Sequence, residues 1–305
     1  DDPAAPYGQR ARELVREALT HLDAGGFDFS QYDANDDGFI DALNVFYAGY
    51  PENGWAVGMW PHSGVISWAA DGVSTYRYQV TNIGASLRLS TFCHENGHMI
   101  CFWPDLYDYD GDSSGVGAFC LMCSSGPGTN PVEPCAPLRD LAQWCTTTEL
   151  EGLQPGLEVV HGVNAVFRVS HPTDPAEYYM FENRQRAGRD QSLPDAGLAI
   201  WHVDLNGSNN HQQQTPAYHY FCTLVQADGL WDLENDRNNG DDTDLWSAPD
   251  HTEFTPDTSP AATWWDGSPA PVYVDGVGAP DASMVFNYRE GLGTMAILVD
   301  VEPGD

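Results

Sequence analysis

Apolar residues recur at helical spacing near the start of the chain, between positions 9 and 22. This spacing predicts an amphipathic first helix. The apolar run 43–48 is rich in β-forming residues and predicts a buried strand, while 76–80 predicts a further strand and 83–89 the approach to a second helix. The apolar face of the first helix would consist of Leu14, Val15, Ala18, Leu19 and Leu22.

The pattern changes near residue 150. Beyond it, short β-like runs alternate with segments rich in Gly, Pro, Asp and Asn, which predicts a β-rich, sandwich-like second half. The polar segment 232–260 is interpreted as loop. The sequence therefore predicts an α/β domain over 1–150 and a β-rich C-terminal domain over 151–305 packed on it. The β-like runs are 163–169, 178–181, 197–203, 220–226 and 294–301.

The charge of the chain excludes several classes of partner. Its 305 residues include 45 acidic and 12 basic side chains, every basic one an Arg, and the formal net charge is −33. Such a chain repels nucleic-acid phosphates and anionic membranes, so neither is expected to bind it. No apolar run reaches the roughly 18 residues of a membrane-spanning helix. Cations are the natural counterpart of this surface, and a monomer is expected.

The first residues and the cysteines are compatible with a secreted, extracellular protein. The sequence opens with Asp-Asp-Pro and no initiator Met, as a mature product does after its leader is removed. Seven cysteines are present, and outside the cell most of them would form disulfides. Cys93 and Cys101 cannot pair if one helix carries both, because they would lie about 12 Å apart. A structural zinc site at Cys120 and Cys123 lacks the second CxxC that it would need.

Residues 94–98 read HENGH, which is the HExxH pattern of zinc metalloproteases. On a helix, His94 and His98 lie on one face, so both imidazoles can bind a single metal ion. Glu95 would then lie beside the metal-bound water, whose pKa zinc lowers toward ~7. The carboxylate can take the proton of that water as it attacks a peptide carbonyl.

The residues that follow this motif fit the same kind of site. Trp103 and Pro104 would end the helix soon after the second histidine. Met122 then lies among turn residues, at an interval after HExxH that matches the Met-turn of a metzincin. A single Met is more often ordinary core, so the preceding motif is what favours the Met-turn interpretation.

The stretch HENGHMICFWPDLYDYD, followed by GAFCLMCSSG, resembles the M6 metalloproteases, the immune-inhibitor-A-like secreted zinc peptidases. Upstream, FDFSQYDANDDGFIDALNVFYAG and WPHSG resemble the family's approach to its active site. Downstream, EYYMFENRQRAGRDQSLPDAGLAIWHVD and VQADG resemble its C-terminal half. The resemblance implies a metzincin-like zinc-protease domain over 1–150 and hydrolysis of peptide bonds in protein substrates.

Two departures from the family bear on the third zinc ligand. The family motif HExxHxxGxxD has a Gly where this chain has Cys101, and the interval from His98 to Asp105 is seven positions instead of six. A Cys at a position of positive φ costs about 1 kcal/mol unless the turn is built differently. The resemblance implies Asp105 as the third ligand, and Asp108 and Asp110 are its competitors.

The segment 33–41 matches the first nine positions of an EF-hand loop, including the Gly at position six. Position twelve is Asn44 instead of the bidentate Glu, and the following segment is predicted to be a strand. A structural calcium site is therefore predicted instead of a complete EF-hand, with an Asp/Asn-rich surface turn as the alternative. The expected calcium ligands are Asp33, Asn35, Asp37, the carbonyl of Phe39, and Asp41.

Other polar residues have weaker signals. His62 could line the catalytic cleft or be a packed structural residue, and His202 lies in an apolar run typical of a hydrogen-bonded core histidine. Glu182 and Arg184 are expected to form a structural ion pair. A second ion site or a solvated acidic loop would explain Asp241, Asp242 and Asp244 equally well.

The sequence thus predicts a secreted zinc endopeptidase in which His94, His98 and Asp105 hold the zinc ion and Glu95 is the general base. Met122 would give the site hydrophobic support from below. Protein or peptide substrates are the expected partners, zinc the catalytic cofactor and calcium a structural one.

Two alternatives to this prediction remain. In one, the chain is a zinc protease of another clan, with Glu133 or Glu149 as the third ligand. In the other, it is a calcium-dependent extracellular binding or adhesion protein on a protease-like scaffold. The intact Glu95 argues against the second alternative, because a purely structural zinc site does not need that carboxylate.

Overall fold

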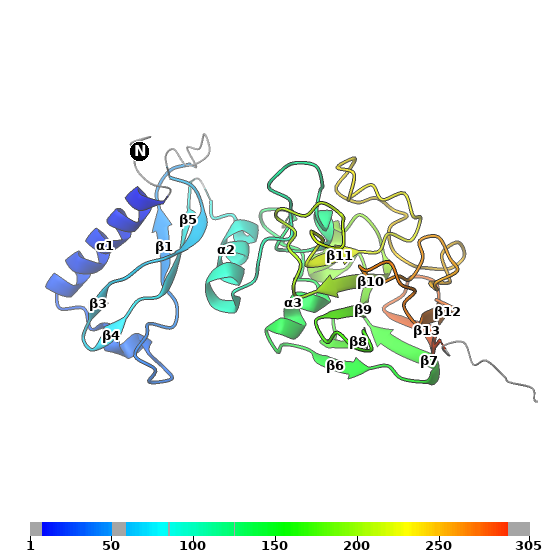
Figure 1. The fold of residues 1–305 in the computed structure, drawn as a ribbon. Helices are drawn as coiled ribbons and strands as arrows, with labels where there is room; N and C mark the ends of the chain where they lie inside the picture. The colour runs from blue at the N-terminus through cyan, green and yellow to red at the C-terminus, as the bar shows by residue number, and fades with distance from the viewer. Residues whose placement is uncertain (1–7, 51–58, 85, 125, 292–305) are drawn as a thin grey trace, which may run out of the picture. The chain divides into compact units, whose positions relative to one another are not determined.

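The computed structural model describes four stretches of the chain, and its contacts group the residues into two compact units (Figure 1). Unit 1 comprises 1–105 and 118–134, and unit 2 comprises 106–117 and 135–305. This division differs from the expected domains 1–150 and 151–305, because residues 135–150 and a short segment after Asp105 belong to unit 2. The described residues are 8–50, 59–84, 86–124 and 126–291.

Unit 1 begins with helix α1 (Gln9–Ala24). Ala11, Val15 and Leu19 recur every four residues and are buried on one face of this helix. Leu14 and Leu22, which were expected on the buried face, are 45% and 44% exposed. Both lie to the side of the Ala11–Leu19 stripe, which alone faces the sheet.

The sheet of unit 1 has the strand order β1-β5-β2, where β1 is Asn44–Tyr47, β2 is His62–Val65 and β5 is Arg77–Asn82. β1 is parallel to β5, and β2 is antiparallel to it. A hairpin of β3 (Ala69–Ala70) and β4 (Val73–Ser74) precedes β5, and a 3-10 turn covers Phe29–Tyr32. The core between α1 and this sheet comprises Val15, Leu19, Phe29, Ile66, Val73, Tyr78 and Val80.

Helix α2 (Leu89–Cys101) packs against β2 and β5 and carries the HExxH motif. Cys101 is its last helical residue, and the left-handed conformation occurs at the next residue, Phe102, with φ of 59°. Cys101 therefore does not need positive φ, and the left-handed residue comes one position after the Gly of the pattern HExxHxxGxxD.

Unit 2 contains most of the strands. A five-stranded sheet has the order β11-β10-β9-β8-β6, and a three-stranded sheet has the order β12-β13-β7. A short helix α3 (Ala136–Leu141) and a 3-10 turn (Gly188–Ser192) accompany them. The strands are β6 (Thr146–Glu149), β7 (Leu153–Val160), β8 (Ala165–Ser170), β9 (Glu177–Arg184), β10 (Gly197–Asp204), β11 (Cys222–Leu224), β12 (Val272–Asp275) and β13 (Ser283–Glu290).

The two sheets of unit 2 share one apolar core. Phe181 of β9 and Phe286 of β13 stack with their ring centroids 5.7 Å apart, and Phe167 of β8 meets Phe286 edge-on at 5.8 Å. Side chains from both sheets therefore interdigitate in the manner of a sandwich. Residues 232–260 contain no helix or strand, as a loop should, and the expected strand 294–301 lies outside the described residues.

The cysteines and the helix lengths bear on two further expectations. No two cysteines of the described chain lie at disulfide distance, so the expected disulfides stay a prediction. Among the described helices, none has the length and apolar character needed to cross a lipid bilayer.

Candidate metal centre

Helix α2 brings the first two predicted ligands to one face. His94 and His98 are one helical turn apart, and Asp105 follows the helix after the turn that Phe102 begins. The exposed fraction of His94 is 8%, so the site is withdrawn from bulk solvent. All of these residues belong to unit 1.

The three side chains converge on one point. Oδ1 of Asp105 lies 2.9 Å from Nε2 of His94 and 3.1 Å from Nε2 of His98. The two Nε2 atoms are 3.1 Å apart. These three atoms form a nearly equilateral triangle, and the three residues are one of two groups in the described chain whose potential ligand atoms cluster within 4.8 Å.

In each imidazole, the hydrogen bond made by Nδ1 determines whether Nε2 carries a hydrogen. Nδ1 of His94 lies 3.0 Å from the carbonyl oxygen of Leu121, and Nδ1 of His98 lies 2.7 Å from that of Trp103. A carbonyl oxygen can only accept, so each Nδ1 carries the hydrogen and donates it. In the neutral rings, both Nε2 atoms therefore present lone pairs to the carboxylate of Asp105. With both rings neutral these three lone-pair atoms repel one another, and either a proton on an imidazole or a bound metal ion between them would relieve the repulsion.

The size of the triangle suits zinc. Zinc bonds to histidine nitrogen and carboxylate oxygen at about 2.0–2.2 Å in tetrahedral geometry, which places neighbouring ligand atoms about 3.3 Å apart. The observed separations of 2.9–3.1 Å are slightly shorter and match one face of such a tetrahedron. Two imidazoles and one carboxylate with a fourth position open form a ligand set typical of catalytic zinc.

The surroundings of the triangle favour the charged forms of His94 and Asp105. Burial lowers the pKa of His94, but its hydrogen bond to Asp105 and the negative charge of Glu95 outweigh this effect, and the pKa is raised overall. Burial would raise the pKa of Asp105, yet the hydrogen bonds that it accepts when the imidazoles of His94 and His98 are protonated hold it well below its usual range. Asp105 is therefore a carboxylate throughout the physiological pH range.

Glu95 lies on α2 between the two histidines in sequence and is 8% exposed. Burial raises the pKa of its carboxyl group, while the positive charges of His94 and His98 and a backbone hydrogen bond from Ser63 of β2 oppose the rise. A carboxylate whose pKa is shifted toward neutrality is a better general base than an exposed one. Ser63, on the edge strand of the sheet, lies in the WPHSG segment, but its contact with Glu95 was not predicted from the sequence.

A methionine supports α2 from below. Met122 is fully buried, and a Cβ atom on Gly97 would lie only 2.7 Å from its Sδ atom and 2.9 Å from Cε3 of Trp103. Gly97, an x position of HExxH, therefore allows both side chains to pack directly on the helix backbone. Leu121, which accepts the hydrogen bond from His94, precedes Met122, so one short segment positions a ligand and fills the space beneath it.

The competing third ligands have other partners. The carboxylate of Asp108 accepts hydrogen bonds from the backbone of Gly111 and Asp112, and Asp110 pairs with His211 at 3.3 Å. The carboxylate of Glu149 accepts from Arg168 and from the backbone of Ser170. Glu133 likewise does not belong to either clustered group in the described chain.

The predicted calcium loop forms a compact turn in unit 1. Asp33 accepts hydrogen bonds from the backbone N–H groups of Asp37 and Gly38, and Gly38 has φ of 85°. The carboxylates of the three predicted aspartate ligands, Asp33, Asp37 and Asp41, do not cluster within 4.8 Å as a set. EF-hand loops often bind the ion through water at the position that Asp41 occupies, so this spacing leaves calcium binding a prediction.

The second clustered group lies in unit 2 and consists of Asp228, Asp241 and Asp244. The sequence had indicated Asp241 and Asp244 together with Asp242. Asp228 was missed because it precedes the acidic run by more than ten positions, and only the fold brings it close. The backbone N–H of Asp241 donates to Asp244, and the hydroxyl of Thr243 bridges Asp228 and Asp241, so the group is already hydrogen-bonded internally.

The remaining candidates have structural partners. Nε2 of His62 lies 2.9 Å from the Tyr78 hydroxyl, and His202 pairs with Glu177 at 2.8 Å. Glu182 forms ion pairs with Arg139 and Arg184. Comparison with known proteins adds no assignment: no protein-family model matches the chain, and no curated protein matches it.

Proposed function

We propose that this chain is a zinc-dependent endopeptidase that resembles the M6 metalloproteases. The observation that carries the proposal is the convergence of two imidazole nitrogens and one carboxylate oxygen, from His94, His98 and Asp105, in a triangle whose size suits zinc. Glu95 lies on the same helix and is not a member of the triangle. A structural zinc site would have no use for that carboxylate, whereas a hydrolytic site needs a base beside its open position.

Each residue of the site would have a distinct role in hydrolysis. His94, His98 and Asp105 hold the ion, which when bound lowers the pKa of a water molecule toward ~7 and polarises the substrate carbonyl. Glu95 takes a proton from the attacking water and delivers it to the leaving amine. Leu121 and Trp103 keep the imidazoles oriented through their carbonyl groups, so little reorganisation accompanies each turnover.

The nature of the substrate comes from the sequence resemblance. HExxH followed by an aspartate ligand and a buried Met supports peptide-bond hydrolysis, and the family that the sequence resembles is secreted. We accordingly propose protein substrates and an extracellular location. The loop 33–41 would hold a structural calcium ion that stabilises unit 1 without entering the chemistry.

The test combines metal analysis with a proteolytic assay. The purified protein is expected to contain zinc and to cleave casein or gelatin. A chelator should abolish cleavage, zinc should restore it, and calcium alone should not. Hydrolysis that persists in zinc-free protein would contradict the proposal. A zinc-loaded protein that cleaves neither substrate would favour the calcium-dependent binding protein instead.

A further inference from the structure

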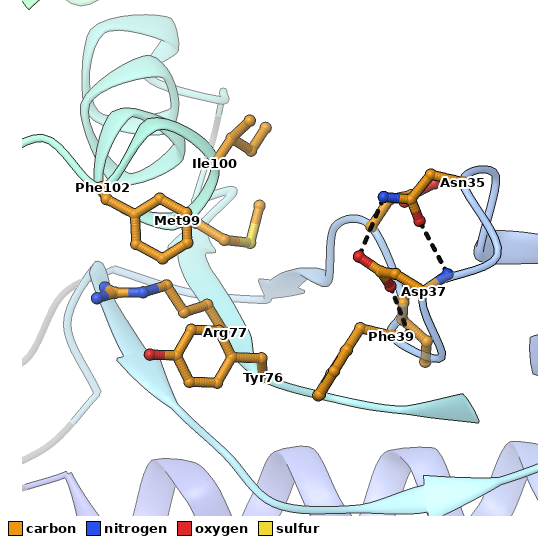
Figure 2. A pocket seen from close by; sticks show the side chains of 10 residues that line it. Asn35, Asp37, Phe39, Tyr76, Arg77, Met99, Ile100 and Phe102 are labelled. Atoms are coloured by element: carbon orange, nitrogen blue, oxygen red, sulfur yellow. Dashed lines mark hydrogen bonds between the residues drawn. The ribbon is translucent and has the colours of Figure 1, made fainter. Parts of the chain in front are cut away.

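Unit 1 contains a cavity that is separate from the metal centre, with none of His94, Glu95, His98 and Asp105 in its lining. Its volume is ≈ 430 Å³, within the range of about 300–1,000 Å³ that is usual for small-ligand pockets. Figure 2 shows the loop 33–41 on one side and the C-terminal end of α2 on the other.

Large apolar side chains surround this cavity and remain exposed. Phe39 is 46% exposed, Tyr76 48%, Ile100 51% and Phe102 59%. A single exposed apolar residue is ordinary, but four around one cavity form a contiguous patch of the kind that marks binding sites. Phe102 is also held at positive φ, a conformation that is unfavourable for an aromatic residue.

Arg77 provides the only basic group in the lining of this cavity. Its guanidinium carbon lies 4.7 Å from the ring centroid of Phe102 and 5.7 Å from that of Tyr76, so the cation lies beside both aromatic rings (Figure 2). Its Nε atom is buried and has no hydrogen-bond partner among the described residues. In a chain with 45 acidic and 12 basic residues, a partly buried Arg that pairs with no carboxylate of the described chain is unexpected.

The carboxylates of the two acidic residues that line the cavity, Asp37 and Asp41, accept hydrogen bonds from other residues of the loop 33–41. Both carboxylate oxygens of Asp37 accept hydrogen bonds within the loop, one from the Asn35 amide and one from the Phe39 backbone. Oδ2 of Asp41 accepts from the backbone of Ala34. Figure 2 shows the Arg77 guanidinium pointing away from this loop, so the two sides of the cavity differ in charge.

These features describe a ligand with three parts. A planar carboxylate matches the fork of the guanidinium, which binds such groups in bidentate fashion. An apolar group must lie close to that carboxylate, because the Phe102 ring is only 4.7 Å from the guanidinium carbon. Toward Asp37 and Asp41 the ligand should present hydrogen-bond donors. The last residue of a peptide combines all three, since its α-carboxylate and side chain share one carbon atom and its N–H follows.

We propose that this cavity binds the C-terminal end of a peptide whose last residue is aromatic or aliphatic, with the α-carboxylate on Arg77. The terminal side chain packs among Met99, Ile100 and Phe102, and the preceding N–H groups face the loop 33–41. The assignment does not depend on the proposed hydrolysis, because none of the zinc ligands lines the cavity.

The test uses N-acetyl-phenylalanine as the probe in a titration followed by NMR of ¹⁵N-labelled protein. The Nε–H resonance of Arg77, assigned by its loss in Arg77→Gln, should shift on binding. N-acetyl-phenylalaninamide, which lacks the carboxylate, and N-acetylglycine, which lacks the side chain, should each bind at least tenfold more weakly. 3-Phenylpropanoate lacks the N–H group and should also bind more weakly. Equal binding of acid and amide by the wild-type protein overturns the proposal even if the Arg77 variant fails to fold.

Variants separate this site from the metal centre. Arg77→Gln should weaken binding of the acid at least tenfold and Arg77→Lys by less, because Lys keeps the charge but not the planar fork. Arg289→Gln is the matched control, since Arg289 also lies over an aromatic ring, that of Tyr273, at 4.1 Å. Arg289→Gln should bind like the wild type. Binding that survives Arg77→Gln but is lost when zinc is removed would place the carboxylate on the metal and contradict the proposal.

Discussion

Nδ1 of His98 donates a hydrogen bond of 2.7 Å to the carbonyl oxygen of Trp103, a residue just beyond the end of the same helix. The N–H of Trp103 in turn donates to the carbonyl of Gly97. The turn that ends α2 therefore also orients a predicted zinc ligand, and Asp105 follows Trp103 by two residues.

Asp105 provides the first prediction. Asp105→Ala should weaken zinc binding by more than ~100-fold, since it removes a ligand and not merely an outer partner, whose loss typically costs about 10–100-fold. Asp108→Ala is the matched control and should keep native affinity, because the Asp108 carboxylate accepts hydrogen bonds from Gly111 and Asp112. Zinc titration of both variants is the measurement. Tight zinc binding by Asp105→Ala would show that another residue is the third ligand.

The second prediction concerns Gly97. Replacing a helical Gly by Ala normally stabilises a protein by about 1 kcal/mol, but here the new Cβ would lie 2.7 Å from Sδ of Met122. Overpacking costs about 1–3 kcal/mol, so Gly97→Ala should lower the free energy of unfolding. In a Met122→Ala background the same substitution should cost less. Chemical denaturation of the four proteins measures both effects, and a more stable Gly97→Ala variant would contradict the close packing.

Calcium provides the third. If the loop 33–41 binds calcium only in the folded state, removing calcium with a selective chelator should lower the Tm by several degrees, since an ion at about 100 times its Kd contributes about 2.7 kcal/mol. Asp33→Asn should abolish this dependence. Asp28→Asn, which alters a nearby carboxylate outside the EF-hand pattern, should retain it. The measurement is the thermal unfolding of each protein with and without calcium. Identical curves for the wild type would show that the loop 33–41 does not bind calcium.

A buried carboxyl group in unit 2 provides the fourth. Burial raises the pKa of Glu234 from its ordinary 4.5 to about 7. The folded state therefore binds more protons than the unfolded state between these pH values, and stability falls as the pH rises from about 4.5 to about 7. The whole fall is about 3 kcal/mol.

The variant Glu234→Gln should lose this part of the pH dependence. Exposed Glu253→Gln is the control and should keep it. The measurement is the free energy of unfolding of each protein from pH 4 to pH 8. Parallel curves for Glu234→Gln and the wild type would show that Glu234 titrates normally.

Features that depend on residues close together in the sequence were easier to predict than features that depend on distant residues. The spacing of His94 and His98 follows from helix geometry alone, and the end of their helix follows from the residues after it. Asp105 required the family resemblance, because a ligand beyond a turn has no fixed spacing. The left-handed Phe102 was not predictable, since an aromatic residue is disfavoured there and only the packed turn holds it in place.

The features that depend on tertiary contacts could not be read from the sequence. The carbonyl of Leu121 orients His94 from a segment 27 positions away. Leu14 and Leu22 fit the helical period as well as Val15 does, yet only the position of the sheet decides which face of α1 is buried. That Arg77 forms no ion pair with the residues that the structure describes likewise could not be predicted, because a sequence so rich in carboxylates suggests partners for every Arg.

Zinc content and proteolysis of Glu95→Gln, measured side by side, show whether Glu95 is the general base. The substitution leaves His94, His98 and Asp105 in place and removes only the base. We expect zinc to be bound as in the wild type and casein cleavage to fall by about 100- to 10,000-fold. A zinc-loaded Glu95→Gln protein that cleaves casein at a near-native rate would contradict this role of Glu95.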